Sequence, residues 1–432
     1  MDLRILKQKD FSLLMFGKAV SLIGSNMQQF ALSLYVLAVT GSATIFASML
    51  AISILPRLLL SPVAGVFGDW FDRKKSIVTL DLFNSVLIGG FALLFWINGE
   101  LSIPSIYVLV ILLEASEIFF GSAMSAVIPS IVKKEELFQA NSIKSVVVNG
   151  ANMLSPLMAS ILYAIVGIQI ILIINSISFF LSALSELAIK IPATHKKPAK
   201  INLKSFKRDF QEGVKLIKEN KMIMNIIGIG VILNFALAPL LSVALLFVIL
   251  ETLGGTEMQY GLFVASLSFA MLLSPVVLGG IAQKIKFGKL LVYTFLCVSG
   301  FVILLGVAAS SMFIGLYTTN TVPFVVITGI TFLIAMVVTL SNIALGTLFE
   351  TIVPKELMGR TGTTMNLCLT IAMPLGQMIY GVALDILQPS YVIGASAVVI
   401  LLSVLYYRKP LLAADNEAEE SSTAEELKRK FA

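Results

Sequence analysis

Two carboxylates, Glu114 and Glu117, lie one helical turn apart in the apolar run VLVILLEASEIFFGSAM. At this spacing their side chains share one face of a helix. Burial and the neighbouring like charge both disfavour the second anion, so we expect at least one carboxyl group to exchange a proton near neutral pH. Such a group is what proton-coupled transport requires. The alternative is that both carboxylates only neutralise Arg57 and hold helices together.

Arg57 lies near the middle of another apolar run, SILPRLLLSP. A charged side chain at this depth in hydrocarbon is costly, and it is therefore a candidate for a functional role. It could form an ion pair with Glu114 or Glu117, or it could face a water-filled cavity. The sequence leaves both roles open.

The segment SPVAGVFGDWFDRKK concentrates two carboxylates and three cations directly after an apolar run. Gly65 in this segment allows close approach of helices. Asp81 follows a few residues into the next apolar run. We interpret Asp81 as part of a charged network at the membrane surface, paired with Arg73 or Lys74.

Amide side chains within the apolar runs are a further set of candidates, because they can hydrogen-bond a substrate. Hydrogen bonds between helices are the alternative for each of them. As a group, they are expected to line a cavity between two halves of the protein, which interspersed Phe and Met side chains would make apolar and adaptable. The amides are Asn26, Gln28, Gln29, Asn149, Asn152, Asn234, Asn342, Asn366 and Gln377.

Composition places these residues in a membrane protein. Of 432 residues, 57% are hydrophobic and 13% are charged, whereas an ordinary soluble domain has about 25% charged residues. The apolar runs are long enough for helices to cross a hydrocarbon core of about 30 Å, and the alternating pattern of a β-barrel is absent. The sequence therefore predicts an all-α integral membrane protein with twelve transmembrane helices. The predicted spans are 11–40, 43–68, 76–97, 103–129, 142–166, 168–190, 221–250, 257–283, 289–310, 318–350, 362–386 and 389–408.

The positions of Lys and Arg predict the orientation. Of the 31 such residues, 30 fall in segments on one side of the membrane, and Arg57 is the remaining one. By the positive-inside rule, both termini are cytoplasmic, in a multi-pass protein of the cytoplasmic membrane. The N-terminus has no signal-peptide cleavage site, so we expect the first span to be retained. Topology accounts for the net charge of +6, and no nucleic-acid partner is needed.

Several chemistries have no support in the sequence. Cys297 and Cys368 both lie within predicted spans, and His195 is the single histidine, so neither a disulfide framework nor a metal site is expected. No GxxxxGK[ST] loop is present, which argues against an ATP-driven pump. We expect no cofactor and no enzymatic activity.

The chain divides near its middle. We predict an N-terminal six-helix half at 1–190, a cytoplasmic linker at 191–220, a C-terminal six-helix half at 221–408, and a polar tail at 409–432 that frays from Leu411. Apolar residues recur at helical spacing in the linker, which indicates an amphipathic helix on the membrane surface. A solvated linker is the alternative. These apolar residues are Leu203, Phe206, Phe210, Val214 and Ile217.

The two halves repeat each other. LLLSPVAGVFGDWFDRKK recurs as MLLSPVVLGGIAQKIKFGK, and SIVKKEELFQANS recurs as TIVPKELMGRTGT, each about 213 to 221 residues downstream. Such parallel repeats are typical of secondary transporters, in which the substrate site lies between the halves near the membrane midplane.

The whole chain resembles the major facilitator superfamily, and within it the drug-efflux group typified by macrolide efflux proteins and the enterobactin exporter. The segment SPVAGVFGDWFDRKK resembles the superfamily signature Gly-x-x-x-Asp-x-x-Gly-Arg-Lys, with Gly65, Asp69, Arg73 and Lys74 in matching places. Asp72 stands where most members have Gly. AVSLIGSNMQQFAL, IPSIVKKEELFQANS and VPKELMGRTG also resemble segments of the efflux group.

The resemblance implies a secondary transporter that exports an amphipathic, macrolide-like or other drug-like small molecule by proton antiport with alternating access. We expect the protein to be a monomer. Departures are also present: the fourth span lacks the Arg of many proton-coupled exporters, and GANMLSPLMAS is a weak version of the antiporter motif. A siderophore exporter or a lysophospholipid flippase of the same fold is one alternative. A non-transporting membrane sensor or partner protein is another.

The resemblance also implies a role for Asp69. It places Asp69 near the start of the eleventh span, around Thr361 and Gly362. A helix N-terminus carries partial positive charge, so Asp69 would attract it and hold the cytoplasmic gate shut. The second copy of the motif has Gln283 at the matching place, so this latch would be asymmetric.

Overall fold

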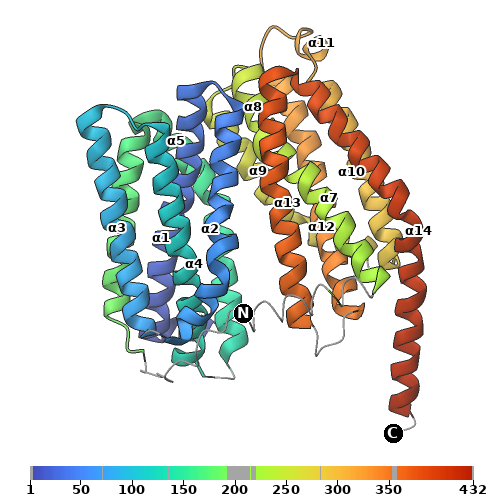
Figure 1. Ribbon diagram of the computed structural model, residues 1–432, viewed down its shortest axis with the longest axis horizontal. Coiled ribbons are helices and arrows are strands. Elements are labelled where there is room, and N and C mark those ends of the chain that lie inside the picture. Colours follow the sequence, from blue (N-terminus) through green and yellow to red (C-terminus); the bar gives the residue numbers. More distant parts are fainter. Residues whose placement is uncertain are drawn as a thin grey trace. The chain divides into compact units, whose positions relative to one another are not determined.

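The computed structural model describes residues 3–70, 72–133, 136–191, 215, 220–282, 284–352 and 358–430. Within these ranges, side chains are described except at 3, 4, 61–63, 65–70, 125, 126, 138, 222, 281, 348–352, 358–364 and 414–430. The described residues form helices and no strand (Figure 1). In chain order the elements are η1 (Leu3–Lys7), α1 (Lys9–Thr40), α2 (Ala43–Trp70), α3 (Arg73–Asn98), α4 (Ile103–Ile131), α5 (Leu137–Leu187), α7 (Lys221–Pro239), η3 (Leu240–Ala244), α8 (Leu245–Phe247), η4 (Val248–Thr252), α9 (Glu257–Ala282), α10 (Phe287–Ala308), α11 (Ser311–Ile314), α12 (Thr321–Ile352), α13 (Met358–Ile386) and α14 (Pro389–Lys430).

Eleven helices in the described part of the chain are long and apolar enough to cross a membrane. One of them, α5, is interrupted at Gly167, where φ is 71° and ψ is −177°. Glycine adopts these angles without the clash that a Cβ atom would cause. The two segments of α5 correspond to the predicted spans 142–166 and 168–190, and the other ten helices match the other ten spans. The prediction of twelve transmembrane segments is therefore confirmed.

The chain forms two compact units. The first unit contains Met1–Gly41, Met49–Leu203 and Thr256–Ala265, and the second contains Ser42–Ser48, Lys204–Gly255 and Ser266–Ala432. Two short segments, the first turns of α2 and the first turns of α9, are grouped apart from the rest of their helices in this division. Each of these segments belongs to the unit that is formed mainly by the other half of the sequence.

Small residues bring α1 and α5 together in the first unit. The Cα atoms of Gly17 and Gly24 lie so close to α5 that a Cβ atom would collide with Ser185 at the first position and with Asn175 at the second. Close approach through glycine is a common way for helices to pack in membranes, because the backbones gain van der Waals contact. The contact between α1 and α5 is the most extensive one between two helices of the described chain.

Reciprocal hydrogen bonds join α3 to α5. Ser85 Oγ donates to the carbonyl oxygen of Ser176, and Ser176 Oγ donates to the carbonyl oxygen of Ser85, each over 2.8 Å. Further along the same pair of helices, Lys74 Nζ donates to the carbonyl oxygen of Leu187 over 2.8 Å. These contacts set the register of α3 against α5, and so they determine which side chains of the two helices meet.

In the second unit, α7 continues through two π-helical turns, η3 and η4, on either side of α8. Helix α13 packs against α7 at Gly376, where the carbonyl oxygen of Phe235 occupies the space of a Cβ atom. The hydroxyl of Tyr380 on α13 bonds the carbonyl oxygen of Ala236 on α7 and the hydroxyl of Ser396 on α14. These bonds tie three helices of the unit together.

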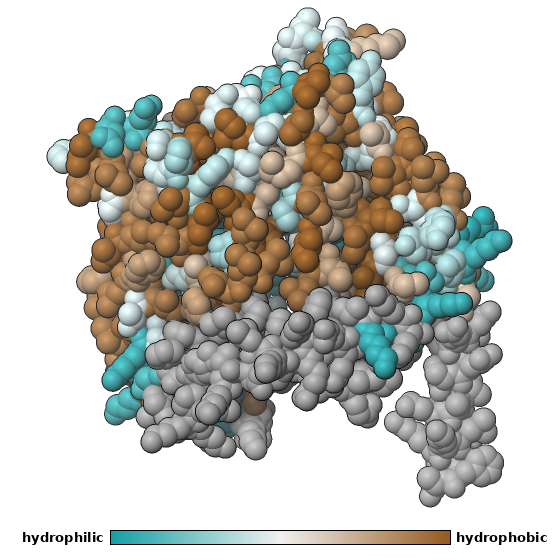
Figure 2. Space-filling view, in the orientation of Figure 1, coloured by the Kyte–Doolittle hydropathy of each residue, from teal (hydrophilic) through white to brown (hydrophobic). Residues whose placement is uncertain are grey.

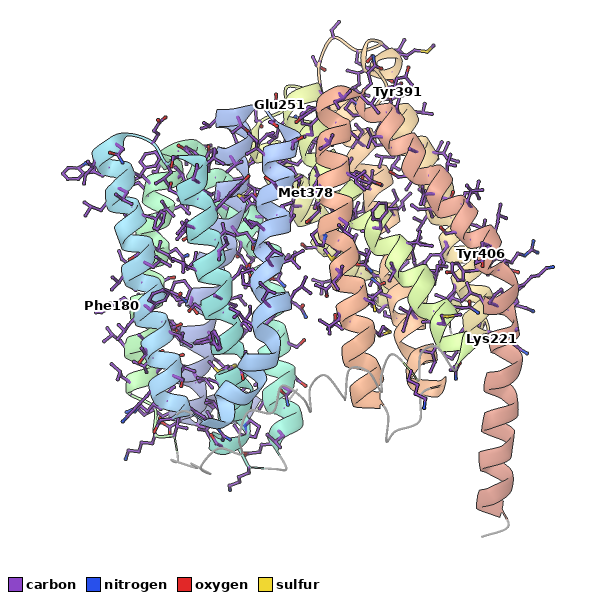
Figure 3. All side chains as sticks on the ribbon, viewed as in Figure 1. Phe180, Lys221, Glu251, Met378, Tyr391 and Tyr406 are labelled. Carbon is purple, nitrogen blue, oxygen red and sulfur yellow. The ribbon has the colours of Figure 1, made fainter. Side chains whose placement is uncertain are left out.

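Hydrophobic side chains dominate the outer surface of the described helices (Figure 2). Phe180 on α5 and Tyr406 on α14 both point outward from their helices, with 47% and 76% of their surface exposed (Figure 3). Exposed aromatic and aliphatic residues in such numbers are unusual for a water-soluble monomer. They fit helices that contact lipid.

Two predictions concern the polar segments. Helix α14 continues to Lys430, so the expectation that the chain frays from Leu411 is wrong. The sequence after Leu411 is rich in Ala, Glu and Lys, which have high helix propensity. The predicted amphipathic helix of 191–220 falls almost wholly outside the described residues.

Candidate functional site

The first unit encloses a cavity of about 260 Å³. Helices α1 to α5 all contribute to its walls. Its polar and charged lining consists of Lys18, Ser21, Ser25, Asn26, Gln28, Gln29, Ser53, Arg57, Asp81, Asn84, Glu114, Glu117 and Asn175. Its apolar lining consists of Leu22, Leu32, Met49, Leu50, Val110, Leu113, Phe120 and Phe179. Polar and charged residues therefore outnumber apolar ones in this lining. A concave site that combines apolar surface with convergent polar groups is typical of small-molecule binding.

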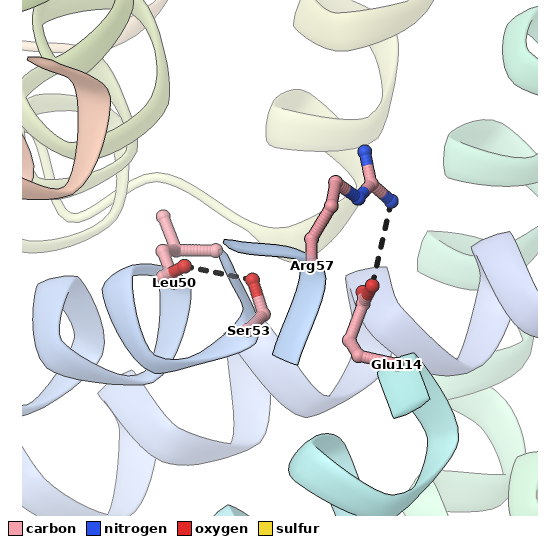
Figure 4. Close-up of polar contacts among 4 residues, drawn as sticks. All are labelled: Leu50, Ser53, Arg57 and Glu114. Atoms are coloured by element: carbon pink, nitrogen blue, oxygen red, sulfur yellow. Dashed lines mark hydrogen bonds and ion pairs between the residues drawn. The ribbon is translucent and has the colours of Figure 1, made fainter. Parts of the chain in front are cut away.

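An ion pair lies at the wall of this cavity. Nη2 of Arg57 on α2 is 3.4 Å from Oε2 of Glu114 on α4 (Figure 4). The Arg57 side chain is 59% exposed and that of Glu114 is 22% exposed. The predicted pairing of Arg57 is therefore present. Because Arg57 also lines the cavity, the two roles that the sequence left open do not exclude each other.

Glu117 projects into the same cavity one turn after Glu114 on α4. Its carboxylate interacts electrostatically with Lys18 on α1 and with Arg57. The Nζ atom of Lys18 lies 5.6 Å from the centre of the Phe120 ring, a cation–π distance. Two acids and two cations from three helices thus line one cavity.

Asp81 does not lie where the sequence analysis placed it. The residue is 1% exposed and lines the cavity, so its assignment to a surface network with Arg73 or Lys74 is wrong. The rotation of α3 turns Asp81 and Asn84 toward the inside of the unit. Asn84, also at the cavity wall, is 2% exposed.

Amide pairs connect α1 with α5 in the first unit. Nδ2 of Asn26 donates to Oδ1 of Asn152 over 2.9 Å. Nδ2 of Asn175 donates to Oε1 of Gln28 over 2.7 Å, and this second pair is buried. Gln29 is exposed at the cavity wall. The remaining candidate of this unit, Asn149, bonds Ser145 on its own helix over 3.2 Å and does not line the cavity.

The other four amide candidates belong to the second unit. Asn234 donates to the carbonyl oxygen of Gly230 over 2.9 Å, within α7. Asn366 accepts a bond of 3.4 Å from Thr370 within α13, and Asn342 is exposed. Gln377 is 4% exposed, and its Oε1 atom is buried with no hydrogen-bond donor among the described residues.

Part of the predicted gating motif is described. Asp72 is the N-cap of α3, where its Oδ1 accepts a bond of 3.0 Å from the backbone N–H of Lys75. Arg73 and Lys74 begin the helix, and Lys74 reaches the C-terminal end of α5. The side chains of Asp69 and Thr361 lie outside the described residues, and Gly65 and Gly362 belong to α2 and α13.

Sequence reasoning missed two charged positions within the spans. Lys18 lies inside the predicted span 11–40 and lines the cavity, where it is half-buried. Glu186 lies inside the predicted span 168–190 and is 1% exposed. The signal that could have found both is the one that found Arg57, an ionisable residue between apolar residues of a span.

Comparison with known proteins places this architecture in a family. The family model described as Major Facilitator Superfamily matches residues 14–377. The chain belongs to the major facilitator superfamily. It is therefore a membrane transporter of this superfamily, built from helices as predicted, and the resemblance seen in its motifs is confirmed.

Relatives of this superfamily member include efflux proteins. It is 25% identical over 265 residues to macrolide efflux protein A of Streptococcus pyogenes, a match that covers 61% of this chain and 64% of the relative. The match thus spans just under two thirds of the relative's length. It is 26% identical over 309 residues to the multi-drug resistance efflux pump PmrA of Streptococcus pneumoniae, which covers 70% of this chain and 72% of that protein.

Solved structures share the superfamily fold. A bacterial homologue of the iron transporter ferroportin in its inward-facing state matches with a TM-score of 0.68 and 17% identity, over 96% of this chain and all of that one. The POT family transporter PepTSo matches with a TM-score of 0.69 and 9% identity, over 94% of this chain and 98% of that one. At these identities the likeness concerns the fold alone.

Proposed function

We propose that this protein exports an amphipathic small molecule of the macrolide or drug-like class, driven by proton entry. The observation that carries the proposal is the cavity of the first unit, whose lining combines apolar side chains with the acids Glu114 and Glu117. The relationship to macrolide and multidrug efflux proteins supports the direction and the class of substrate.

The apolar wall suits the hydrophobic part of such a substrate. Leu32, Met49 and Phe179 come from three different helices, and all three line the cavity. Met and Phe side chains adapt to ligands of different shape. At about 260 Å³, the cavity is slightly smaller than the 300–1,000 Å³ typical of drug sites. The proposal is that it holds one portion of a larger amphiphile.

The acids of the cavity are the groups that would bind the coupling proton. Glu114 and Glu117 lie on one face of α4 at the cavity wall, with Arg57 beside Glu114 and Lys18 near Glu117. A proton that binds one of these carboxylates weakens its attraction for the neighbouring cation. Proton binding thereby changes the relative stability of two conformations, which is what a coupled cycle needs.

The test is transport into inverted membrane vesicles with and without a pH gradient. Export of a macrolide should depend on the gradient in the wild type, and Glu114→Gln or Glu117→Gln should reduce the gradient-dependent part by about tenfold or more. Glu100→Gln is the matched control, because Glu100 lies in the loop between α3 and α4 and is exposed. If both cavity variants transport as the wild type does, the coupling assignment is wrong.

The same vesicles separate the alternatives. A lysophospholipid flippase would move headgroup-labelled lipid and not the macrolide, and a siderophore exporter would move the siderophore. A sensor would bind ligand and transport nothing. The proposal further includes a cytoplasmic-membrane location with both termini in the cytoplasm, which rests on the distribution of Lys and Arg. It also takes the protein to be a monomer.

A further inference from the structure

A second pair of buried acids lies beside the cavity, on helices α3 and α5. Lys74 and Ser85 are eleven positions apart on α3, as are Ser176 and Leu187 on α5. Hydrogen bonds join the two helices at both ends of these stretches. The register of the two antiparallel helices is therefore fixed across the whole interval. On α3, Asp81 lies between these two contacts. On α5, Glu186 lies next to Leu187, at the contact with Lys74.

Both acids are almost completely buried. Asp81 and Glu186 are each 1% exposed. Oδ2 of Asp81 and Oε2 of Glu186 have no hydrogen-bond donor among the described residues. Ser182 interacts with the Asp81 carboxylate and is one turn before Glu186 on the same face of α5, and its Oγ atom is also buried without a hydrogen-bond partner among the described residues. Two ionised carboxylates buried in this way would lack the hydrogen bonds that such groups need.

The other charged groups around the pair do not donate the hydrogen bonds that these two carboxylates lack. The groups that interact electrostatically with it are Lys18 from α1 and Glu117 from α4. Lys74 of α3 bonds the carbonyl oxygen of Leu187, and Asp10 of α1 accepts a bond from the backbone N–H of Lys190. Among the described residues, Lys18 forms no ion pair with either acid, and its Nζ atom lies over the Phe120 ring. One ammonium group thus faces three carboxylates.

We propose that Asp81 and Glu186 form a second proton-binding site, in which the two carboxyl groups share one proton. A proton converts one of the two acceptors into a donor, so that one carboxyl group can hydrogen-bond the other. It also removes one of the negative charges around Lys18. Like charges placed close together in a buried site cannot both ionise without a large cost.

The location gives this site a role in transport. Asp81 lines the cavity that holds Glu117, whereas Glu186 lies one residue before the end of α5, where Lys74 bonds Leu187. The acid pair therefore connects the proton site of the cavity with the end of the first unit that the sequence predicts to face the cytoplasm. This role rests on the proposed proton-driven export, but the binding of a proton to the pair does not.

The binding is tested by infrared spectroscopy on the purified full-length protein in detergent, titrated from low to high pH. The wild type should show the C=O stretching band of protonated carboxyl groups. Asp81→Asn and Glu186→Gln should each lose the part of this band that comes from the carboxyl group holding the shared proton. Glu100→Gln should titrate as the wild type does. Unchanged bands in both acid variants would overturn the proposal.

Ser182→Ala tests the shared proton even if Asp81→Asn or Glu186→Gln fails to fold. Ser182→Ala keeps both acids and removes only the hydroxyl beside Asp81, so it should shift the frequency of this band while the protein remains folded. An unshifted band in Ser182→Ala would contradict the site.

The same variants, in inverted vesicles, separate this inference from the proposed function. If the band of the pair is present but no amphiphile is exported, the proposed function fails and the proton site stands. If gradient-driven export is normal and the band is absent, the proton site fails and the proposed function stands.

Discussion

Asp385 near the end of α13 caps the N-terminus of α2 through Ser42. Ser42 Oγ donates to Oδ2 of Asp385 over 2.7 Å, and the backbone N–H groups of Ala43 and Thr44 donate to its two carboxylate oxygens over 2.7 and 3.1 Å. All of these residues belong to the second unit. A carboxylate at this position satisfies N–H groups that have no partner within the helix, and it complements the positive end of the helix dipole.

Removal of this cap should destabilise the protein. We expect Asp385→Ala to lower the free energy of unfolding by about 0.5–2 kcal/mol, because the first N–H groups of α2 lose their acceptor. Asp385→Asn keeps one acceptor oxygen and should lose less. Thermal unfolding in detergent, followed by circular dichroism, measures both variants, and equal losses for the two would contradict the cap.

Gly376 should not tolerate a methyl group. A Cβ atom there would collide with the carbonyl oxygen of Phe235, which belongs to the backbone of α7 and cannot move cheaply, and would lie 2.7 Å from Cγ of Pro239. We expect Gly376→Ala to cost about 1–3 kcal/mol. At Gly394 on α14, no atom lies within 4 Å of the added Cβ position.

Gly394→Ala is therefore the matched control for Gly376→Ala. It should raise stability by about 0.5–1 kcal/mol, because alanine is the better helix former. Melting temperatures of the two variants should move in opposite directions. A shift of the same sign in both would show that the contact of α13 with α7 is not tight.

The buried amide pair of Gln28 and Asn175 should matter more for stability than the exposed amides do. Gln28→Leu leaves Nδ2 of Asn175 without its acceptor, which should cost about 1–3 kcal/mol. Replacement of both residues by Leu should recover part of that loss, because no polar group then remains unsatisfied. Asn149→Leu, at an exposed position, should change the melting temperature little.

Asp69 remains a predicted gate residue, on the grounds of the superfamily signature. We expect Asp69→Asn to slow export while substrate binding is retained, because a latch worth about 0.3–2 kcal/mol biases the conformational equilibrium and does not form the cavity. Export into inverted vesicles and equilibrium binding of the same labelled substrate measure the two effects. Loss of binding with intact conformational exchange would refute the assignment.

The sequence by itself determined the transmembrane helices. A helix satisfies its backbone hydrogen bonds locally, and an apolar run of sufficient length can cross a membrane whatever its neighbours are, so all twelve spans were predictable. The pairing of Arg57 with an acid was also predictable, because a charge deep in a span needs a partner. The superfamily could be recognised from short sequence motifs, which do not depend on how the helices pack.

Only the tertiary structure decided which faces of these helices meet. Asp81 lies near a helix start, where the sequence suggests a surface position, but the rotation of α3 turns it inward to the cavity. Lys18 and Glu186 approach it from helices far away in the sequence, and Ser42 and Asp385 are separated by 343 positions. Such contacts depend on packing through residues such as Gly17 and Gly24, and the register that packing selects is a property of the folded helices together.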